Sequence, residues 1–208
     1  MNKKEVIDEA IKACDYGFWA GICGILSPFA ALLGLSYFLA FIYVVFLVIA
    51  LYNLGKLFGD NKIKAAGILQ FLGIFLLILA ITYISWIFMK TAAGQIFMGT
   101  KLSNQTIRSI IPVENLGIFP LIFLATALLI FAVSQILLVY SLLRFSSKLR
   151  VRYFQYTAIL LCITLIFGFL GFFIPSSAIT IVSGLLAFSY FILLALSFRT
   201  ARNKLMKF

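Results

Sequence analysis

The side chains of this sequence that could bind a ligand are mostly basic, and many of them crowd into two short segments. The stretch RFSSKLRVR, residues 144–152, holds four basic residues in nine positions, and a second basic group lies at residues 56–64. Arg and Lys bind the phosphates of anionic lipids and the carboxylates of acidic proteins. We therefore predict an anionic-lipid or partner contact that comprises Lys56, Lys62, Lys64, Arg144, Lys148, Arg150 and Arg152.

Uncharged polar side chains that interrupt long apolar stretches form a second candidate group. These residues are Gln70, Thr82, Thr126 and Gln135. Between membrane helices, hydrogen bonds of such side chains contribute less than about 2 kcal/mol each, so they fix helix register more than they add stability. We interpret the four residues as intramembrane polar contacts. The alternative is a polar pathway lined by Ser134, Gln135, Gln70 and Thr82.

Groups for catalysis or metal binding are scarce. The chain has no histidine, its three cysteines lack CxxC spacing, and its six acidic residues all lie outside the long apolar stretches. A Ser or Cys nucleophile would lack an evident base, and an ion-coupled carrier would lack an intramembrane ionisable group. We expect a non-enzymatic protein with no cofactor and no metal. We also expect no nucleic-acid partner, because short basic loops offer no recognition helix.

The composition indicates which elements hold these residues. The chain is 64% hydrophobic and 11% charged with a mean hydropathy of +1.15, whereas about a quarter of the residues of soluble domains are charged. Charged residues are missing from residues 16–55, 65–89, 115–143 and 153–198. One helical span needs about 20 apolar residues. The four windows therefore hold two, one, one and two spans.

Six transmembrane helices follow, in an all-α polytopic membrane helix bundle. The turn signals GLS at 34–36 and PSS at 175–177 divide the two long windows. The strands of a barrel would alternate polar and apolar residues, whereas these runs are apolar on every face. The predicted helices are residues 16–33, 37–57, 65–89, 118–143, 153–173 and 178–198.

The remaining segments complete the predicted organisation. Residues 1–15 form an amphipathic cytoplasmic helix, 16–89 hold the first three spans, 90–117 form an extracytoplasmic loop, 118–198 hold the last three spans, and 199–208 are a basic cytoplasmic tail. Within the loop, Asn104 begins the sequon NQT and is a predicted glycosylation site. Ile107, Ile110 and Ile111 share one helical face, which predicts a short interfacial helix that ends at Pro112.

The distribution of charge predicts the orientation. Six spans place both termini and residues 58–64 and 144–152 on one side, which carries fourteen of the seventeen basic residues. Basic flanks resist translocation, so this side is expected to be cytoplasmic. We predict a multi-pass protein of the cell membrane with both termini in the cytoplasm. The basic segments then serve first as topological anchors.

An internal similarity appears at an offset of 88 residues. Six of thirteen positions in residues 52–64 match residues 140–152 in type, among them Tyr52 with Tyr140 and Lys56 with Arg144. Two related helical hairpins, the second with the third helix and the fourth with the fifth, would give this pattern. Independent gain of Tyr and basic residues by inner loops is the alternative.

Two stretches carry a resemblance to known proteins. WAGICGILSPFAALLG, followed by FLVIALYNLGKLFGDNKIKAAGIL, contains a GI-x-GIL-like element, a short outer turn and a basic inner loop. Over about the first 70 residues the chain resembles the opening hairpin of small archaeal multi-pass membrane proteins of uncharacterised function. The resemblance implies an archaeal-type integral membrane protein and assigns no functional residue.

Together these features favour a structural or accessory subunit in the lipid bilayer. We expect it to pack against other membrane subunits or against copies of itself, because its spans are apolar on every face and lack catalytic groups. The alternative is a passive channel or carrier for an uncharged or amphiphilic solute, including lipid, lined by the polar residues of the spans.

Overall fold

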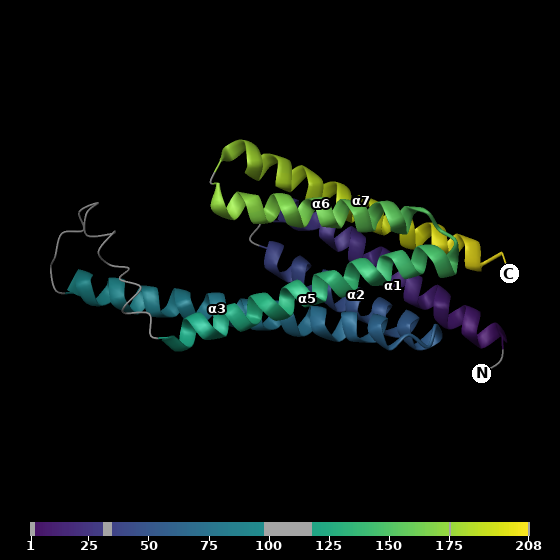
Figure 1. The fold of residues 1–208 in the computed structure, drawn as a ribbon, viewed down its shortest axis with the longest axis horizontal. Coiled ribbons are helices and arrows are strands. Elements are labelled where there is room, and N and C mark those ends of the chain that lie inside the picture. The colour runs from purple at the N-terminus through teal and green to yellow at the C-terminus, as the bar shows by residue number, and fades with distance from the viewer. Residues whose placement is uncertain (1–2, 31–34, 98–117, 175, 208) are drawn as a thin grey trace. The chain divides into compact units, whose positions relative to one another are not determined.

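The computed structural model describes residues 3–30, 35–97, 118–174 and 176–207. Within these ranges the chain forms six helices and no strand (Figure 1). The helices are α1 (Lys3–Ala30), α2 (Ser36–Leu57), α3 (Asn61–Phe97), α5 (Ile118–Leu149), α6 (Tyr153–Phe173) and α7 (Ser177–Leu205). The predicted all-α fold class is confirmed.

Five of these helices are long and apolar enough to cross a membrane. The candidate spans are Phe38–Leu57, Asn61–Tyr83, Ile122–Leu149, Tyr153–Gly171 and Ser177–Leu205. They support a multi-pass helical membrane protein. Helix α1 is outside this group; it joins the charged segment predicted as a surface helix and the apolar residues that follow in one continuous helix. Residues 31–33 of the predicted first span lie outside the described residues, so that span remains a prediction.

Three helices extend beyond the ends expected from the sequence. Helix α5 continues to Leu149 rather than to residue 143, α7 to Leu205 rather than to 198, and α3 to Phe97 rather than to 89. The sequence predicts each end just before the first charged residue, Arg144, Arg199 or Lys90. Arg and Lys form helices well, however, and a helix satisfies its own backbone bonds in water as in lipid. Thus RFSSKL is helical, and so are residues 90–97 of the predicted loop.

The turn between α2 and α3 is built from GKLFGD. Gly59 has φ 64°, a left-handed conformation that glycine adopts without strain from a Cβ. The Asp60 N–H donates to the Gly55 carbonyl at 2.9 Å, and the Gly59 N–H donates to the Lys56 carbonyl at 3.3 Å. Asp60 Oδ1 then accepts the N–H of Lys62 at 2.9 Å and so caps α3. Six residues therefore end one helix and begin the next.

The described chain divides into two compact units. Unit 1 comprises Met1–Phe71 and Ser134–Phe208, and unit 2 comprises Leu72–Val133. In unit 1, α1 packs against α2 and α7, and α7 packs against α6. Helix α1 approaches α7 through a face of Gly17, Gly21 and Gly24. A Cβ on Gly21 would lie 2.7 Å from the backbone nitrogen of Ala195, so the two backbones are almost in contact.

Three phenylalanines anchor the ends of α5, α6 and α7 in the core of unit 1. Phe145, Phe154 and Phe198 are fully buried. The ring centroids of Phe154 and Phe198 are 5.1 Å apart, and those of Phe145 and Phe154 are 5.6 Å apart, both edge to face. Edge-to-face contact is a favoured arrangement of aromatic rings. This cluster fixes helix ends at which eight of the seventeen basic residues lie.

Unit 2 consists of the second part of α3 and the first part of α5. The two helices approach closely at Gly73, where a Cβ would lie 3.1 Å from Cα of Phe131. Ala80 and Ala127 are also buried. Small residues therefore form the contact between the helices of unit 2, as is common in membranes.

Candidate functional site at the basic end

Four basic segments of unit 1 lie at one end of that unit, which we call the basic end (Figure 1). It comprises the start of α1, the α2–α3 turn, the end of α5 with its turn to α6, and the end of α7. Three polar contacts join these segments: Arg202 with Asp15, Lys204 with Arg150, and Arg144 with Asp60. The structure thus brings together the segments that the six-span topology places on one side.

Asp60 links the α2–α3 turn to α5. Its Oδ2 accepts the hydroxyl of Tyr140 at 3.2 Å and lies 3.6 Å from Nε of Arg144. The Nζ of Lys62 lies 5.5 Å from the centroid of the Tyr140 ring, within cation–π range. Two of the predicted contact residues, Arg144 and Lys62, are therefore engaged in contacts within the protein.

Arg202 and Asp15 link α7 to α1. Nε of Arg202 lies 2.8 Å from Oδ1 of Asp15, and both side chains are partly exposed. Surface ion pairs contribute at most about 1 kcal/mol, so this pair orients the two helices more than it stabilises them. The neighbouring thiol of Cys14 is fully buried. Burial, and after it the negative charge of Asp15, raises the pKa of Cys14 to about 12, so the thiol stays protonated.

The turn between α5 and α6 has a left-handed residue and the same type of backbone hydrogen bond as the α2–α3 turn. Arg150 has φ 51°, and the N–H of Val151 donates to the Ser146 carbonyl at 3.2 Å. Arg150 thus stands where Gly59 stands in the other turn. The gapless alignment at 88 residues instead pairs Gly59 with Ser147. The two turns therefore correspond at different residues when compared by sequence and when compared by backbone. That the two hairpins are related stays a prediction.

A pocket of about 330 Å³ lies beside this turn, between the start of α6 and the end of α7. Its lining residues are Arg150, Val151, Arg152, Tyr153, Tyr156, Thr200 and Lys204. Three of them are cationic, three carry hydroxyl groups, and none of these described lining residues is acidic. Helix α6 begins at Tyr153, so the positive end of its dipole adds to the field. Such a lining suits an anion that carries phosphate or carboxylate oxygens.

Lys204 organises the pocket from the opposite helix. Its Nζ donates a hydrogen bond to the carbonyl of Arg150 at 3.0 Å, which ties the end of α7 to the α5–α6 turn. An ammonium has three N–H donors, so two remain for other acceptors. The lining residue Val151 is buried, and Phe154, which follows the lining residue Tyr153, belongs to the phenylalanine cluster described above. The start of α6, where the pocket lies, is therefore anchored in the core.

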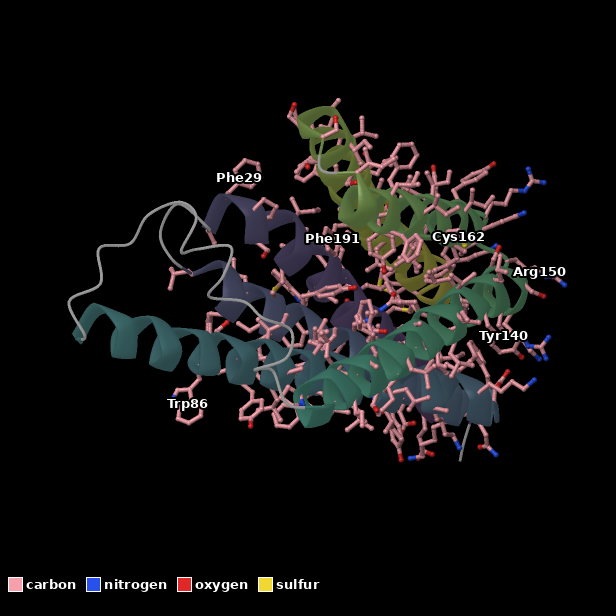
Figure 2. All side chains as sticks on the ribbon, turned by 60° about the vertical axis from the view of Figure 1, so that its left-hand side comes forward. Phe29, Trp86, Tyr140, Arg150, Cys162 and Phe191 are labelled. Carbon is pink, nitrogen blue, oxygen red and sulfur yellow. The ribbon has the colours of Figure 1, made fainter. Side chains whose placement is uncertain are left out.

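The pocket contains two of the seven predicted contact residues, Arg150 and Arg152. Lys56 and Lys148 are exposed outside it, and Nζ of Lys64 donates to Oδ1 of Asn61 at 3.2 Å. Figure 2 shows Arg150 and Tyr140 at the end of unit 1 where side-chain nitrogens gather. The sequence prediction missed the pocket residues Tyr153, Tyr156, Thr200 and Lys204. Thr200 and Lys204 are four residues apart and therefore share a face of α7. Because the predicted helix ends at residue 198, this spacing did not point to a site.

The predicted intramembrane polar residues divide between the two units. In unit 1, Nε2 of Gln135 donates to Oε1 of Gln70 at 3.2 Å, and both side chains are buried. In unit 2, Thr82 and Thr126 are exposed, and Oγ1 of Thr126 donates to the carbonyl of Ile122 in its own helix at 2.8 Å. The glutamines therefore join α3 to α5, whereas Thr126 satisfies its hydroxyl within α5.

Two further polar pairs in the interior of unit 1 were not predicted. The hydroxyls of Thr157 on α6 and Ser197 on α7 lie 3.0 Å apart, and both residues are buried. The hydroxyl oxygens of Tyr43 on α2 and Tyr190 on α7 lie 3.5 Å apart. Each pair joins residues far apart in the chain, so no local pattern indicated it.

Other predicted features lie outside these groups. Asn104 and the predicted interfacial helix at 107–111 fall outside the described residues. In the described part of the chain, Cys14, Cys23 and Cys162 are free thiols, and no three metal-ligating side chains come together. Comparison of the chain with protein-family models, with curated proteins and with solved structures found no match. Its function is therefore inferred from the geometry above.

Proposed function

We propose that this chain is a non-enzymatic accessory subunit of the membrane, which packs within the bilayer against partner proteins or against further copies of itself. The observation that carries the proposal is the apolar surface of unit 2. Among its large side chains, Leu129 is 68% exposed, Ile122 56% and Ile78 52%. Ile78, Leu79 and Ile81 are all exposed on the broad side of α3 that faces away from the buried Ala80. This surface needs an apolar cover.

The polar side chains of the spans support the same proposal over a passive channel or carrier. Gln70 and Gln135 direct their amides to each other in the interior, and Thr157 and Ser197 pair in the same way. Thr126, Thr164, Thr180 and Ser189 donate to carbonyls of their own helices. Hydrogen bonds made inside the protein are typical of side chains that fix helix packing.

Site-specific photocrosslinking in the native membrane tests the proposal. A photoreactive residue at Leu129, on the exposed surface of unit 2, should give a discrete protein–protein adduct. The same residue at Leu138, which is buried on the same helix, should react only within the chain. Extraction in mild detergent should then recover the chain in a larger assembly. Adducts with lipid alone at Leu129, together with a lone monomer after gentle extraction, would contradict an accessory role.

Reconstitution in liposomes tests the alternative. If the purified chain carried a solute or a lipid across the bilayer, and if replacement of Gln135 by Leu changed that flux without unfolding the protein, a channel or carrier would replace the accessory role. Absence of flux over a panel of uncharged and amphiphilic solutes agrees with the accessory role. The pair of glutamines is then a packing contact.

A further inference from the structure

We propose that the pocket at the α5–α6 turn binds the phosphate headgroup of an anionic phospholipid. This inference does not depend on the accessory role proposed above, because it concerns a different surface of the chain. It rests on the chemistry of the lining, on the backbone of Arg150, and on the apolar residues that continue from the pocket along α6 and α7.

The lining first selects an anion. Arg150, Arg152 and Lys204 contribute three cations, and no described lining residue offers a carboxylate to neutralise them. The two acidic side chains that form ion pairs elsewhere at the basic end, Asp15 and Asp60, pair with Arg202 and Arg144 instead. Guanidinium groups bind phosphate oxygens in a forked geometry. A volume of about 330 Å³ is within the range of small-molecule sites, about 300–1,000 Å³.

The backbone of Arg150 is the second observation. Its φ of 51° is unfavourable for a residue with a Cβ, and the equivalent position of the α2–α3 turn is occupied by Gly59. A glycine at residue 150 would relieve the strain. The chain instead places a cation there, on the wall of the pocket, and Lys204 holds the carbonyl of the same residue. Strained residues of this kind concentrate at binding sites.

The surroundings of the pocket select a lipid rather than a soluble anion. On α7, Lys204, Thr200 and Leu196 succeed one another at four-residue spacing, so cationic, hydroxyl and apolar side chains follow one helix face. On α6, Tyr156 is followed at helical spacing by Ile159 and Ile163, both exposed. Helices α6 and α7 pack against each other. From the pocket along these helices, charged side chains are followed by hydroxyl groups and then by apolar side chains. This order matches the phosphate, the glycerol and the acyl chain of a phospholipid.

The exposed tyrosines agree with this placement. Tyr153 and Tyr156 are 44% and 51% exposed at the start of α6. Tyrosine is enriched where membrane helices meet the headgroup layer, because its ring is apolar and its hydroxyl is polar. Two exposed tyrosines at the pocket thus support the proposed contact with the phosphates of a bilayer.

Native mass spectrometry of the delipidated, purified full-length chain tests the proposal. Three ligands are compared: phosphatidylglycerol, zwitterionic phosphatidylcholine, and inorganic phosphate. We expect discrete adducts with phosphatidylglycerol and weaker binding of phosphatidylcholine, whose choline is repelled by the three cations. Inorganic phosphate should neither bind as tightly nor displace the lipid. Equal binding of phosphatidylglycerol and phosphatidylcholine would overturn the proposal, and so would tighter binding of inorganic phosphate, which would make the pocket a site for a soluble anion.

Substitutions locate the binding to the pocket. Arg150→Gly should weaken phosphatidylglycerol binding about fivefold, the value that corresponds to one basic residue close to anionic headgroups. Because this change relieves backbone strain, the unfolding temperature should be unchanged or higher, so loss of binding cannot arise from unfolding. Lys204→Gln keeps a donor for the Arg150 carbonyl but removes the charge, and it should also weaken binding about fivefold.

Lys148→Gln is the matched control, because Lys148 is an exposed cation on the last turn of α5 that does not line the pocket. It removes the same charge and should leave binding close to that of the unchanged chain. If Lys148→Gln weakened binding as much as Lys204→Gln and Arg150→Gly do, the lipid would be attracted by the general charge of the basic end, and the pocket would not be the site.

Discussion

Gln70 on α3 and Gln135 on α5 share a buried hydrogen bond of 3.2 Å. Removal of one partner leaves the other amide buried without its bond, so we expect Gln135→Leu to lower the free energy of unfolding by about 1 kcal/mol. The double variant Gln70→Leu with Gln135→Leu removes both polar groups and should recover most of this loss. Thermal unfolding in detergent, followed by circular dichroism, measures both. A double variant that loses the sum of the two single losses would show that the pair is not coupled.

Asp60 caps α3 and also contacts Tyr140 and Arg144, and two substitutions separate these roles. Asn caps a helix as well as Asp does, so Asp60→Asn should keep the cap and weaken only the contacts of Oδ2 with Arg144 and Tyr140, at a cost of about 1 kcal/mol or less. Asp60→Ala also removes the cap and should lower the free energy of unfolding by about 1–2 kcal/mol. Chemical denaturation of the purified variants gives both values. Equal losses for Asn and Ala would mean that the cap contributes nothing.

Gly21 allows α1 to approach the backbone of α7 at Ala195, and its replacement should be damaging. A Cβ there would lie 2.7 Å from a backbone nitrogen that cannot move aside like a flexible side chain, so Gly21→Ala should destabilise the protein by about 1–3 kcal/mol. Gly184 on α7 is the control, since nothing lies within 4 Å of its Cβ position. Gly184→Ala should be neutral or stabilising by up to about 1 kcal/mol, because Ala favours helix. The difference in unfolding temperature is the measurement.

Cys14 should resist alkylation in the folded protein. Burial, and then the charge of Asp15, raises its pKa from 9.0 to about 12, and only the thiolate reacts. At about pH 8 roughly one thiol in ten thousand would be ionised. Iodoacetamide labelling followed by peptide mass spectrometry should therefore modify Cys14 only after denaturation. Rapid labelling in the folded state would show that the thiol is accessible.

The same shift predicts how stability depends on pH. The folded-state pKa of Cys14 is raised above its ordinary value, so folding disfavours the thiolate. The contribution of the protonated thiol is complete below about pH 9 and is lost as the pH rises from there towards 12. Cys14→Ser, which does not ionise in this range, should remove that part of the alkaline loss. Unfolding temperatures of both proteins across the alkaline range measure it.

Some of the site could be predicted from sequence and some could not. Arg150 and Arg152 were predicted as contact residues because basic residues cluster locally, and the structure places both in the pocket. Lys204 falls in the predicted tail, because the prediction ends each helix just before the first charged residue after a span. Arg202 and Lys204 in fact lie in the last turn of α7, where cations favour the negative end of the helix dipole. A charged residue marks where a membrane span ends, but the helix itself can continue beyond it.

By itself, the sequence determined the helical class, the starts of α2 at Ser36 and of α7 at Ser177 within the predicted turn signals, and the concentration of charge at certain helix ends. Those properties depend on residues close together in the chain, where apolar length and turn residues act directly. Only the tertiary structure decided that Gln70 meets Gln135, that Asp60 meets Tyr140, and that Lys204 closes the pocket beside Arg150. Spans that are apolar on every face carry no periodic signal for which side packs inward. Which helices pack together therefore depends on close contacts such as those of Gly17, Gly21 and Gly24 with α7. These contacts exist only in the packed structure.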